Sequence, residues 1–348
     1  MTSGEPLIAL DAMGGDNAPA EIVKGAVMAA RELGVRVALV GRPHAVEMQL
    51  AKHGARPETL TVVPATGVIE MDESPALAAR QKKDSSIVVG LRMVKQGEAA
   101  AFVSAGNTGA VMAAGIMYLG RIRGIERPSL VGLIPLSRLS VLLDVGANAD
   151  CKPEYLLQWA QMASAYMERI WKVPNPRVAL LNIGEEEEKG SALAQEAYEL
   201  LKESGLNFIG NVEGRDVPFA RADVIVTDGF TGNVVVKTME GMADYIMGEI
   251  RSAIRSRPWY LAAGAALLPA FAKVRKKTDY REYGAGPLLG VNGLVFIGHG
   301  RSDARAIRSA LRVAREAAQS GMLEAIRESA PQRVGAEADS AAETETGR

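Results

Sequence analysis

Five short apolar runs in this sequence are each followed by a cluster of Gly, Asn, Asp or Ser. The clusters lie at Asp11–Asn17, Ser104–Gly109, Asp144–Asn148, Asn182–Glu186 and Asp228–Asn233. A helix-like segment follows each cluster, so backbone N–H groups would lie at helix N-termini, where anions bind readily. Glycine also lets the backbone approach a ligand closely. The clusters therefore predict a crevice lined with backbone donors and small polar side chains.

The elements that position these clusters follow from the apolar patterning. Continuous apolar runs bounded by turn residues are typical of strands buried on both faces. Helices are expected between them, most clearly at Glu21–Leu33, Asn107–Leu119, Lys152–Trp171, Glu188–Ser204, Thr231–Arg255 and Asp303–Ser320. This alternation predicts an α/β fold, Rossmann-like, with a mostly parallel sheet and helices on both faces. If the five strands belong to one sheet, the clusters share its carboxyl edge, where such sheets bind ligands.

We expect a single α/β domain over residues 6–328 and a disordered acidic tail over 329–348. The segment 251–281 breaks the pattern, because it carries eight basic residues and one acidic residue. Within it, Pro258–Ala272 is uncharged and is interrupted by Pro269. This stretch is too short to cross a bilayer. It predicts an element that lies at an apolar interface, with cations flanking it.

Composition narrows the possible functions. The formal net charge of −1 and the few aromatic residues argue against nucleic-acid binding. A lone cysteine, Cys151, excludes a disulfide within the chain and a cysteine-based zinc site, so we expect a cytoplasmic protein. The sequence also has no signal-like segment before the strand expected near Leu7, and no apolar stretch of membrane-spanning length.

Several common catalytic motifs are missing from the sequence. It has no P-loop, no G-x-G-x-x-G that opens a helix, no H-E-x-x-H and no G-x-S-x-G. A nucleotide-driven kinase, a simple Rossmann dehydrogenase and a serine hydrolase are therefore disfavoured. We interpret the acidic run Glu185–Glu188 as the first turn of a helix, stabilised by the helix dipole, rather than as a metal site. We expect neither a metal nor a cofactor.

Five sequence blocks occur in order between about Leu7 and Met322. They are Asp11–Asp16, Arg80–Ser86, Ser104–Ala110, Asp228–Asn233 and Gly284–Gly290. Together they resemble the PlsX family of bacterial phosphate acyltransferases. The resemblance implies a catalytic domain that transfers a fatty acyl group from acyl carrier protein (ACP) to inorganic phosphate. It also implies a homodimer, a fold like that of phosphotransacetylases and isocitrate/isopropylmalate dehydrogenases, and a membrane glycerol-3-phosphate acyltransferase that uses the product.

The chemistry of this implied reaction guides the choice of site residues. Phosphate must be held by N–H groups, hydroxyls and cations, and we expect these from Lys82, Lys83, Ser104, Gly106, Asn107, Thr108 and Gly109. Oxyanion stabilisation is expected from Asn148, Asn182 or Asn233, and protonation of the leaving thiolate from Lys237 or His299. For His299, a structural role fits the sequence equally well. Further active-site loop residues are expected at Asp11, Gly14, Gly15, Asp16, Asp144, Asn148, Asp228, Gly229 and Gly232.

The basic segment suits an acidic carrier protein or an anionic membrane. We expect shallow insertion of Trp259, Leu267, Leu268 and Phe271, with Lys273, Arg275, Lys276 and Lys277 meeting anionic lipid or ACP. This arrangement predicts peripheral association with the inner face of the plasma membrane. Alternatively, the apolar stretch packs against the dimer partner.

Three other functions remain open from the sequence. The first is a phosphate acetyl- or butyryltransferase that uses acyl-coenzyme A. The second is an NAD-dependent decarboxylating dehydrogenase of similar fold, and the third is a non-enzymatic coupling protein at the membrane. For acyl transfer we expect direct attack by phosphate, because Cys151 has no histidine near it in the sequence that would activate it.

Overall fold

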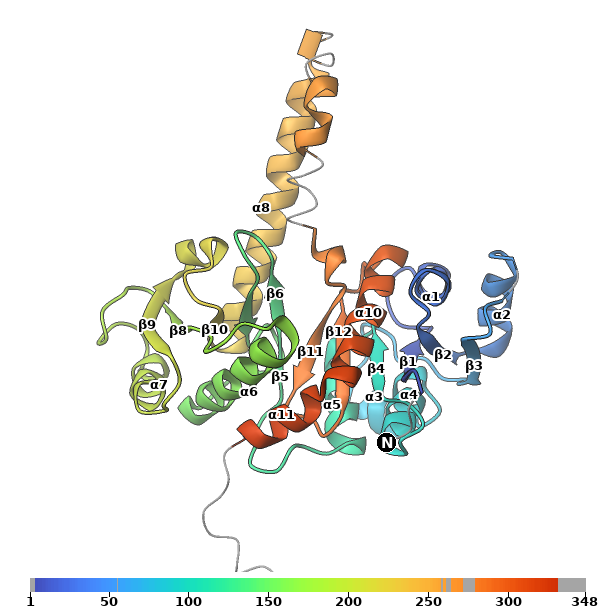
Figure 1. Cartoon of the computed structure of the whole chain (residues 1–348), viewed down its shortest axis with the longest axis horizontal. Coiled ribbons are helices and arrows are strands. Elements are labelled where there is room, and N and C mark those ends of the chain that lie inside the picture. Colours follow the sequence, from blue (N-terminus) through green and yellow to red (C-terminus); the bar gives the residue numbers. More distant parts are fainter. Residues whose placement is uncertain (1–3, 55, 258, 261–263, 272–278, 331–348) are drawn as a thin grey trace, which may run out of the picture.

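The computed structural model describes residues 4–54, 56–257, 259–260, 264–271 and 279–330. Strands and helices alternate as expected, but the strands form two sheets, so the prediction of one sheet is wrong (Figure 1). In the described residues the larger sheet contains, in spatial order, β3 (Leu60–Pro64), β2 (Arg36–Gly41), β1 (Leu7–Asp11), β4 (Ala101–Ser104), β12 (Leu294–Gly298), β11 (Ala285–Leu289) and β5 (Ser129–Leu130). The smaller sheet contains β6 (Gly132–Ile134), β7 (Ser140–Leu143), β10 (Val224–Val226), β8 (Val178–Asn182) and β9 (Phe208–Glu213).

Both sheets are mostly parallel, which confirms the predicted fold class. In the larger sheet, Ala9 of β1 lies opposite Ala38 of β2 and Phe102 of β4. The antiparallel pairs are β11 with β12, β11 with β5, and β6 with β7. β1 and β4 are buried along almost their whole length, as continuous apolar runs require.

Residues 129–134 carry the chain from one sheet to the other. Leu130 of β5 pairs with Leu288 of β11, whereas Leu133 of β6 pairs with Val141 of β7. A Cβ at position 286 would lie only 2.0 Å from the carbonyl oxygen of Val131, so this close approach requires glycine. The two sheets therefore meet at a tightly packed junction.

Helices cover both faces of the larger sheet. On one face, α1 (Ala20–Leu33) and α10 (Ala304–Ser320) share an apolar core with α6 (Pro153–Trp171) and α11 (Met322–Ser329), and this core continues under the smaller sheet. On the other face lie α3 (Pro75–Gln81), α4 (Ser86–Lys95) and α5 (Thr108–Tyr118). The outer helices are α2 (Pro43–Ala51), near β3, and α7 (Ala192–Lys202), against β8 and β9.

The helix α8 (Gly229–Arg255) starts beside the sheets and extends far out of the body of the molecule (Figure 1). A helical segment at 264–271 packs beside its outer half, and a Cβ at position 264 would lie 2.7 Å from Ile254 Cγ2. We call residues 241–271 the arm. Its exposed apolar side chains are Met242, Tyr245, Ile246, Trp259, Tyr260, Leu267 and Leu268, and Phe271 is half-buried.

Two predictions concern residues that the structure does not describe. The predicted cations Lys273, Arg275, Lys276 and Lys277 lie outside them, as does the predicted tail from residue 331 onward. Within the described residues, every helix is too short or too polar to cross a bilayer.

Candidate active site

A cavity of about 400 Å³ lies between the two sheets, at the ends of β4, β7, β10 and β12. Its polar wall includes Thr108, Asn233, Lys237, Glu240 and His299. Its apolar wall includes Leu130, Val131, Leu133, Val145 and Val236. Glycine backbone also lines the cavity, at Gly106, Gly132, Gly146, Gly284, Gly286, Gly298 and Gly300. The cavity therefore combines polar groups from both sheets with an apolar surface.

Asp11 and Ser104 fix the loop that follows β4. Ser104 Oγ donates to Asp11 Oδ2 at 2.7 Å and accepts from the Gly106 N–H at 3.0 Å. Both side chains are buried, and burial raises the pKa of Asp11 above the ordinary range of a carboxyl group. A Cβ at position 14 would lie 2.3 Å from Asp11 Oδ2, so Gly14 is required where the two loops cross. Asp11 and Ser104 thus position the Gly106 backbone at the cavity wall.

Asn107 begins α5 and holds a second loop. Its Oδ1 accepts from the Ala110 N–H at 3.0 Å, which makes it the N-cap of the helix. Its Nδ2 donates to the carbonyl oxygens of Glu70 and Met71 at 3.2 and 3.1 Å. The buried side chain is thereby used for structure, and Thr108, the next residue, presents the helix N-terminus to the cavity.

Asp144 has the corresponding position on the smaller sheet. Its Oδ1 accepts from the Leu130 N–H at 2.9 Å, and its Oδ2 accepts from the Asn148 N–H at 2.6 Å. Burial raises the pKa of Asp144. A Cβ at Gly232 would lie 1.9 Å from the Asp144 carbonyl oxygen, and one at Gly229 would lie 2.4 Å from that of Asn148. These glycines allow α8 to begin directly against the turn.

The first half of α8 carries the polar side chains of the cavity. Asp228 caps the helix by accepting from the Thr231 N–H at 2.8 Å. Asn233, Lys237 and Glu240 then recur at helical spacing and face the cavity together. The structure thus brings together three predicted catalytic residues, Asn233, Lys237 and His299, and adds Glu240, which the sequence analysis missed. The signal for Glu240 was its position one turn after Lys237 on the same helix face.

Lys237, Glu240 and His299 form a compact charged cluster. Lys237 Nζ lies 2.9 Å from His299 Nε2 and 3.1 Å from Glu240 Oε2. The hydrogen bond from His299, followed by that from Lys237, lowers the pKa of Glu240 to about 2. His299 Nδ1 accepts from the Arg301 N–H at 3.2 Å. His299 Nε2 lies 3.6 Å from Glu240 Oε2, so both ring nitrogens face polar partners.

Other predicted site residues lie outside the cavity lining. Lys82 Nζ donates to the carbonyl oxygen of Val68 at 2.7 Å and pairs with Glu73, and Lys83 is exposed. Asn182 closes its own loop, because its Nδ2 donates to the Lys189 carbonyl oxygen at 2.9 Å. Two further residues, Gly15 and Asp16, contact the Gly300 backbone behind the cavity wall.

The interpretation of Glu185–Glu188 as a helix start is wrong, because α7 begins only at Ala192, after the capping residue Ser191. The acids lie in an exposed loop, where Glu185 pairs with Arg221 and Glu187 with Lys202. Across the described ranges, no group of three or more His, Cys, Asp or Glu residues is arranged to hold a metal.

Cys151 does not have the environment of a nucleophile. Burial raises the pKa of its thiol to about 11, so the reactive thiolate is scarce at neutral pH. Its Sγ lies 3.4 Å from the carbonyl oxygen of Asn148, and the half-buried side chain packs against the apolar core.

Comparisons with solved structures support the fold. A phosphotransacetylase from Streptococcus pyogenes superposes with a TM-score of 0.59 at 18% identity, covering 91% of this chain and 95% of the other. A 4-hydroxythreonine-4-phosphate dehydrogenase from Klebsiella pneumoniae gives 0.53 at 13% identity, covering 92% and 100%. At these identities the likeness shows a shared fold.

Sequence comparisons show the family. A protein called phosphate acyltransferase from Heliobacterium modesticaldum is 54% identical over 94% of this chain and 98% of its own length. A protein of the same name from Desulfitobacterium hafniense is 52% identical over 93% and 97%. The family model described as "Fatty acid synthesis protein" matches residues 7–325. The chain therefore belongs to this family of acyltransferases, the PlsX family that its sequence blocks resemble.

Proposed function

We propose that this enzyme transfers a long-chain fatty acyl group from acyl-ACP to inorganic phosphate. The observation that carries the proposal is the cavity, in which a helix N-terminus and a lysine face an apolar wall. Phosphate requires the polar surface with its N–H groups and positive charge, and an acyl chain requires the apolar wall. The family and the name shared by the relatives support the same reaction class.

The polar wall would bind phosphate. The first N–H groups of a helix have no partner within the helix, and α5 presents its start at Thr108. The Thr108 hydroxyl and the Lys237 ammonium, on the same wall, add a hydrogen bond and a positive charge. Asn107, Ser104 and Asp11 support this surface from behind.

The reaction would proceed by direct displacement. A phosphate oxygen attacks the thioester carbonyl carbon, the C–S bond breaks, and the electron pair leaves with sulfur. The Asn233 side-chain amide, which lines the cavity, would donate to the developing oxyanion. The leaving thiolate takes a proton from the Lys237–His299 pair, which Glu240 holds together.

The apolar wall would receive the acyl group. Leu133, Val145 and Val236 line the cavity between the junction of the sheets and α8. On the same helix, beyond Val236, lie the exposed apolar side chains of Met242, Tyr245 and Ile246. An apolar wall and exposed apolar residues on one helix favour a long-chain donor over an acetyl or butyryl donor.

The arm would meet the partners of the enzyme. Arg251, Arg255 and Arg257 are exposed near its tip, beside exposed apolar side chains, which is the composition of a peripheral membrane element. We propose that the enzyme is a cytoplasmic homodimer that binds reversibly to the anionic inner face of the plasma membrane. There it would deliver acyl phosphate to a membrane glycerol-3-phosphate acyltransferase.

Turnover with matched donors tests this function. The protein is incubated with phosphate and either palmitoyl-ACP, palmitoyl-coenzyme A or acetyl-coenzyme A, and acyl phosphate and free thiol are measured. Sequential kinetics with palmitoyl-ACP as the best donor, retained by Cys151→Ala, are expected. Preference for acetyl-coenzyme A would support the short-chain alternative, whereas ping-pong kinetics or an acyl-Cys151 adduct would contradict direct displacement.

A further inference from the structure

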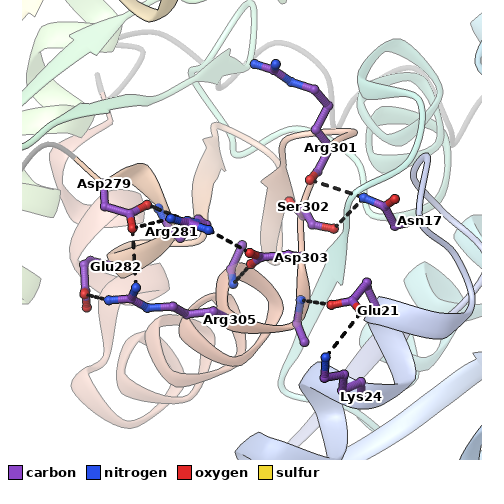
Figure 2. A network of polar contacts seen from close by, with 12 residues as sticks. Asn17, Glu21, Lys24, Asp279, Arg281, Glu282, Arg301, Ser302, Asp303 and Arg305 are labelled. Carbon is purple, nitrogen blue, oxygen red and sulfur yellow. Dashed lines mark hydrogen bonds and ion pairs between the residues drawn. The ribbon is translucent and has the colours of Figure 1, made fainter. Parts of the chain in front are cut away.

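A network of ion pairs at the base of the arm has Arg281 at its centre (Figure 2). Here the chain returns from the arm into β11, through the short helix η2 (Tyr280–Glu282). Arg281 Nε and one terminal nitrogen donate to the two oxygens of Asp279 at 2.7 and 2.8 Å. The other terminal nitrogen donates to Asp303 Oδ2 at 2.9 Å. A planar guanidinium bridges two carboxylates in this way, and a lysine does not.

The network joins the base of the arm to the start of α10. Asp303 uses its second oxygen, Oδ1, to cap α10 by accepting from the Ala306 N–H at 3.0 Å. From α10, Arg305 reaches back to Asp279 at 3.4 Å and pairs with Glu282 (Figure 2). The helix start is thus held by one oxygen of Asp303 and the arm base by the other.

The same helix start ends the turn that carries His299. Ser302 donates to the His299 carbonyl oxygen twice, from its N–H at 2.9 Å and from its Oγ at 2.6 Å. Asn17 Nδ2 lies 3.4 Å from the carbonyl oxygens of Arg301 and Ser302 (Figure 2). The turn from His299 to Asp303 is therefore short and internally bonded, so a displacement of Asp303 moves the imidazole.

Arg281 also lies two residues before a second segment that lines the cavity. Tyr283 and Gly284 line the cavity directly after η2. A Cβ at position 284 would lie 2.2 Å from the carbonyl oxygen of Ala306, so this backbone packs tightly against α10. Arg281 is not part of the cavity lining, yet it fixes two of the segments that are.

We infer that Arg281 is a positioning residue for acyl transfer, which holds the His299 turn and the 283–284 backbone in register through Asp303. The inference rests on the proposed function for the role of His299 in turnover. The ion pair is one-quarter exposed on the Arg281 side, so its contribution to folding is modest. Its main effect is geometric, because misplacing a catalytic group by about 1 Å can cost about a hundredfold in rate.

Two variants separate this role from general stability. Arg281→Gln removes the bridge. Asp303→Asn keeps Oδ1 for the Ala306 N–H but replaces Oδ2 by an amide nitrogen, which cannot accept from Arg281. The matched control is Arg308→Gln, also on α10, where Arg308 pairs with Glu32 and has a similar exposure, 27% against 25%.

Two quantities are measured, the NMR signals of the His299 imidazole and the turnover rate. The chain contains three histidines, so the ¹⁵N ring signals of His299 are assigned by their loss in His299→Gln. Arg281→Gln and Asp303→Asn should both shift these signals and lower kcat about tenfold or more, with Arg281→Lys giving at most partial recovery. Arg308→Gln should change neither.

Unchanged His299 signals in folded Arg281→Gln and Asp303→Asn proteins would overturn the inference, as would equal effects from Arg308→Gln. If Arg281→Gln does not fold, Asp303→Asn alone decides, because it keeps the helix cap. Shifted signals with unchanged turnover would support the positioning role and would instead contradict the proposed function of His299.

Discussion

Two buried aspartates hold equivalent turns in place, one on each sheet. Asp11 holds the turn after β4 through Ser104, and Asp144 holds the turn after β7 through Asn148. Neither side chain lines the cavity, and burial raises the pKa of both. Their hydrogen bonds to backbone N–H groups and a hydroxyl fix the loops whose backbone and neighbouring residues line the cavity.

In the proposed phosphate site, one residue would bind phosphate and its neighbour would support the loop. Thr108→Val should raise the KM for phosphate several-fold, about 1 kcal/mol for one lost hydrogen bond, and leave the melting temperature nearly unchanged. Asn107→Ala should lower stability by about 1–2 kcal/mol, because the helix cap and the bonds to Glu70 and Met71 are lost. Steady-state kinetics and thermal unfolding distinguish them; a phosphate KM that Thr108→Val leaves unchanged would remove Thr108 from the site.

Glu240 should make the free energy of unfolding depend on pH in the acid range. Its pKa of about 2 in the folded protein lies below the ordinary value of 4.5, so its contribution is complete above pH 4.5 and is lost as pH falls towards 2. The difference in free energy of unfolding between wild type and Glu240→Gln should therefore shrink below pH 4.5 in urea titrations. Glu47→Gln, which breaks the exposed pair with Arg56, is the control and should show little difference at any pH. A difference that grows with acidity would contradict the assignment.

At the scale of elements, the sequence predicted most helices and strands but not how they divide into sheets. The strand ends at Ser104, Asp144 and Asp228 were recognisable because apolar runs stop at turn residues. The short strands β5 and β6 and the Gly- and Pro-containing β11 have too little local signal, and only their pairing defines them. Glu240 and His299 are far apart in the chain, so their contact depends on that same assembly.

The face of α8 that lines the cavity should set the acyl-chain length. Val236 belongs to the apolar wall, so Val236→Trp fills space that a long chain needs. The ratio of kcat/KM for palmitoyl-ACP over octanoyl-ACP should fall about tenfold. Val234→Trp is the control, since Val234 lies on the same helix and is 47% exposed. Equal ratios in wild type and Val236→Trp would place the acyl chain elsewhere.

At the scale of the whole molecule, α8 connects the cavity to the arm. Its first turns supply Asn233, Lys237 and Glu240 to the cavity, and its outer half forms the arm (Figure 1). One helix therefore carries both the polar side chains of the cavity and the exposed apolar side chains of the arm. The two solved structures compared above share the fold at 18% and 13% identity, so they do not show what the arm contacts.

The arm should bind anionic membranes weakly and reversibly. Each basic residue near such a surface contributes about 1 kcal/mol, which salt screens, and shallow burial of side chains such as Leu268 adds to it. Leu268→Glu should abolish co-sedimentation with vesicles of phosphatidylglycerol and phosphatidylethanolamine, while Leu77→Glu, at a similarly exposed site in the body, should not. Size-exclusion chromatography of the same variants tests the alternative. If wild type elutes as a dimer that Leu268→Glu separates, or if wild type does not bind the vesicles even at low salt, the apolar face of the arm packs against a second copy of the chain instead.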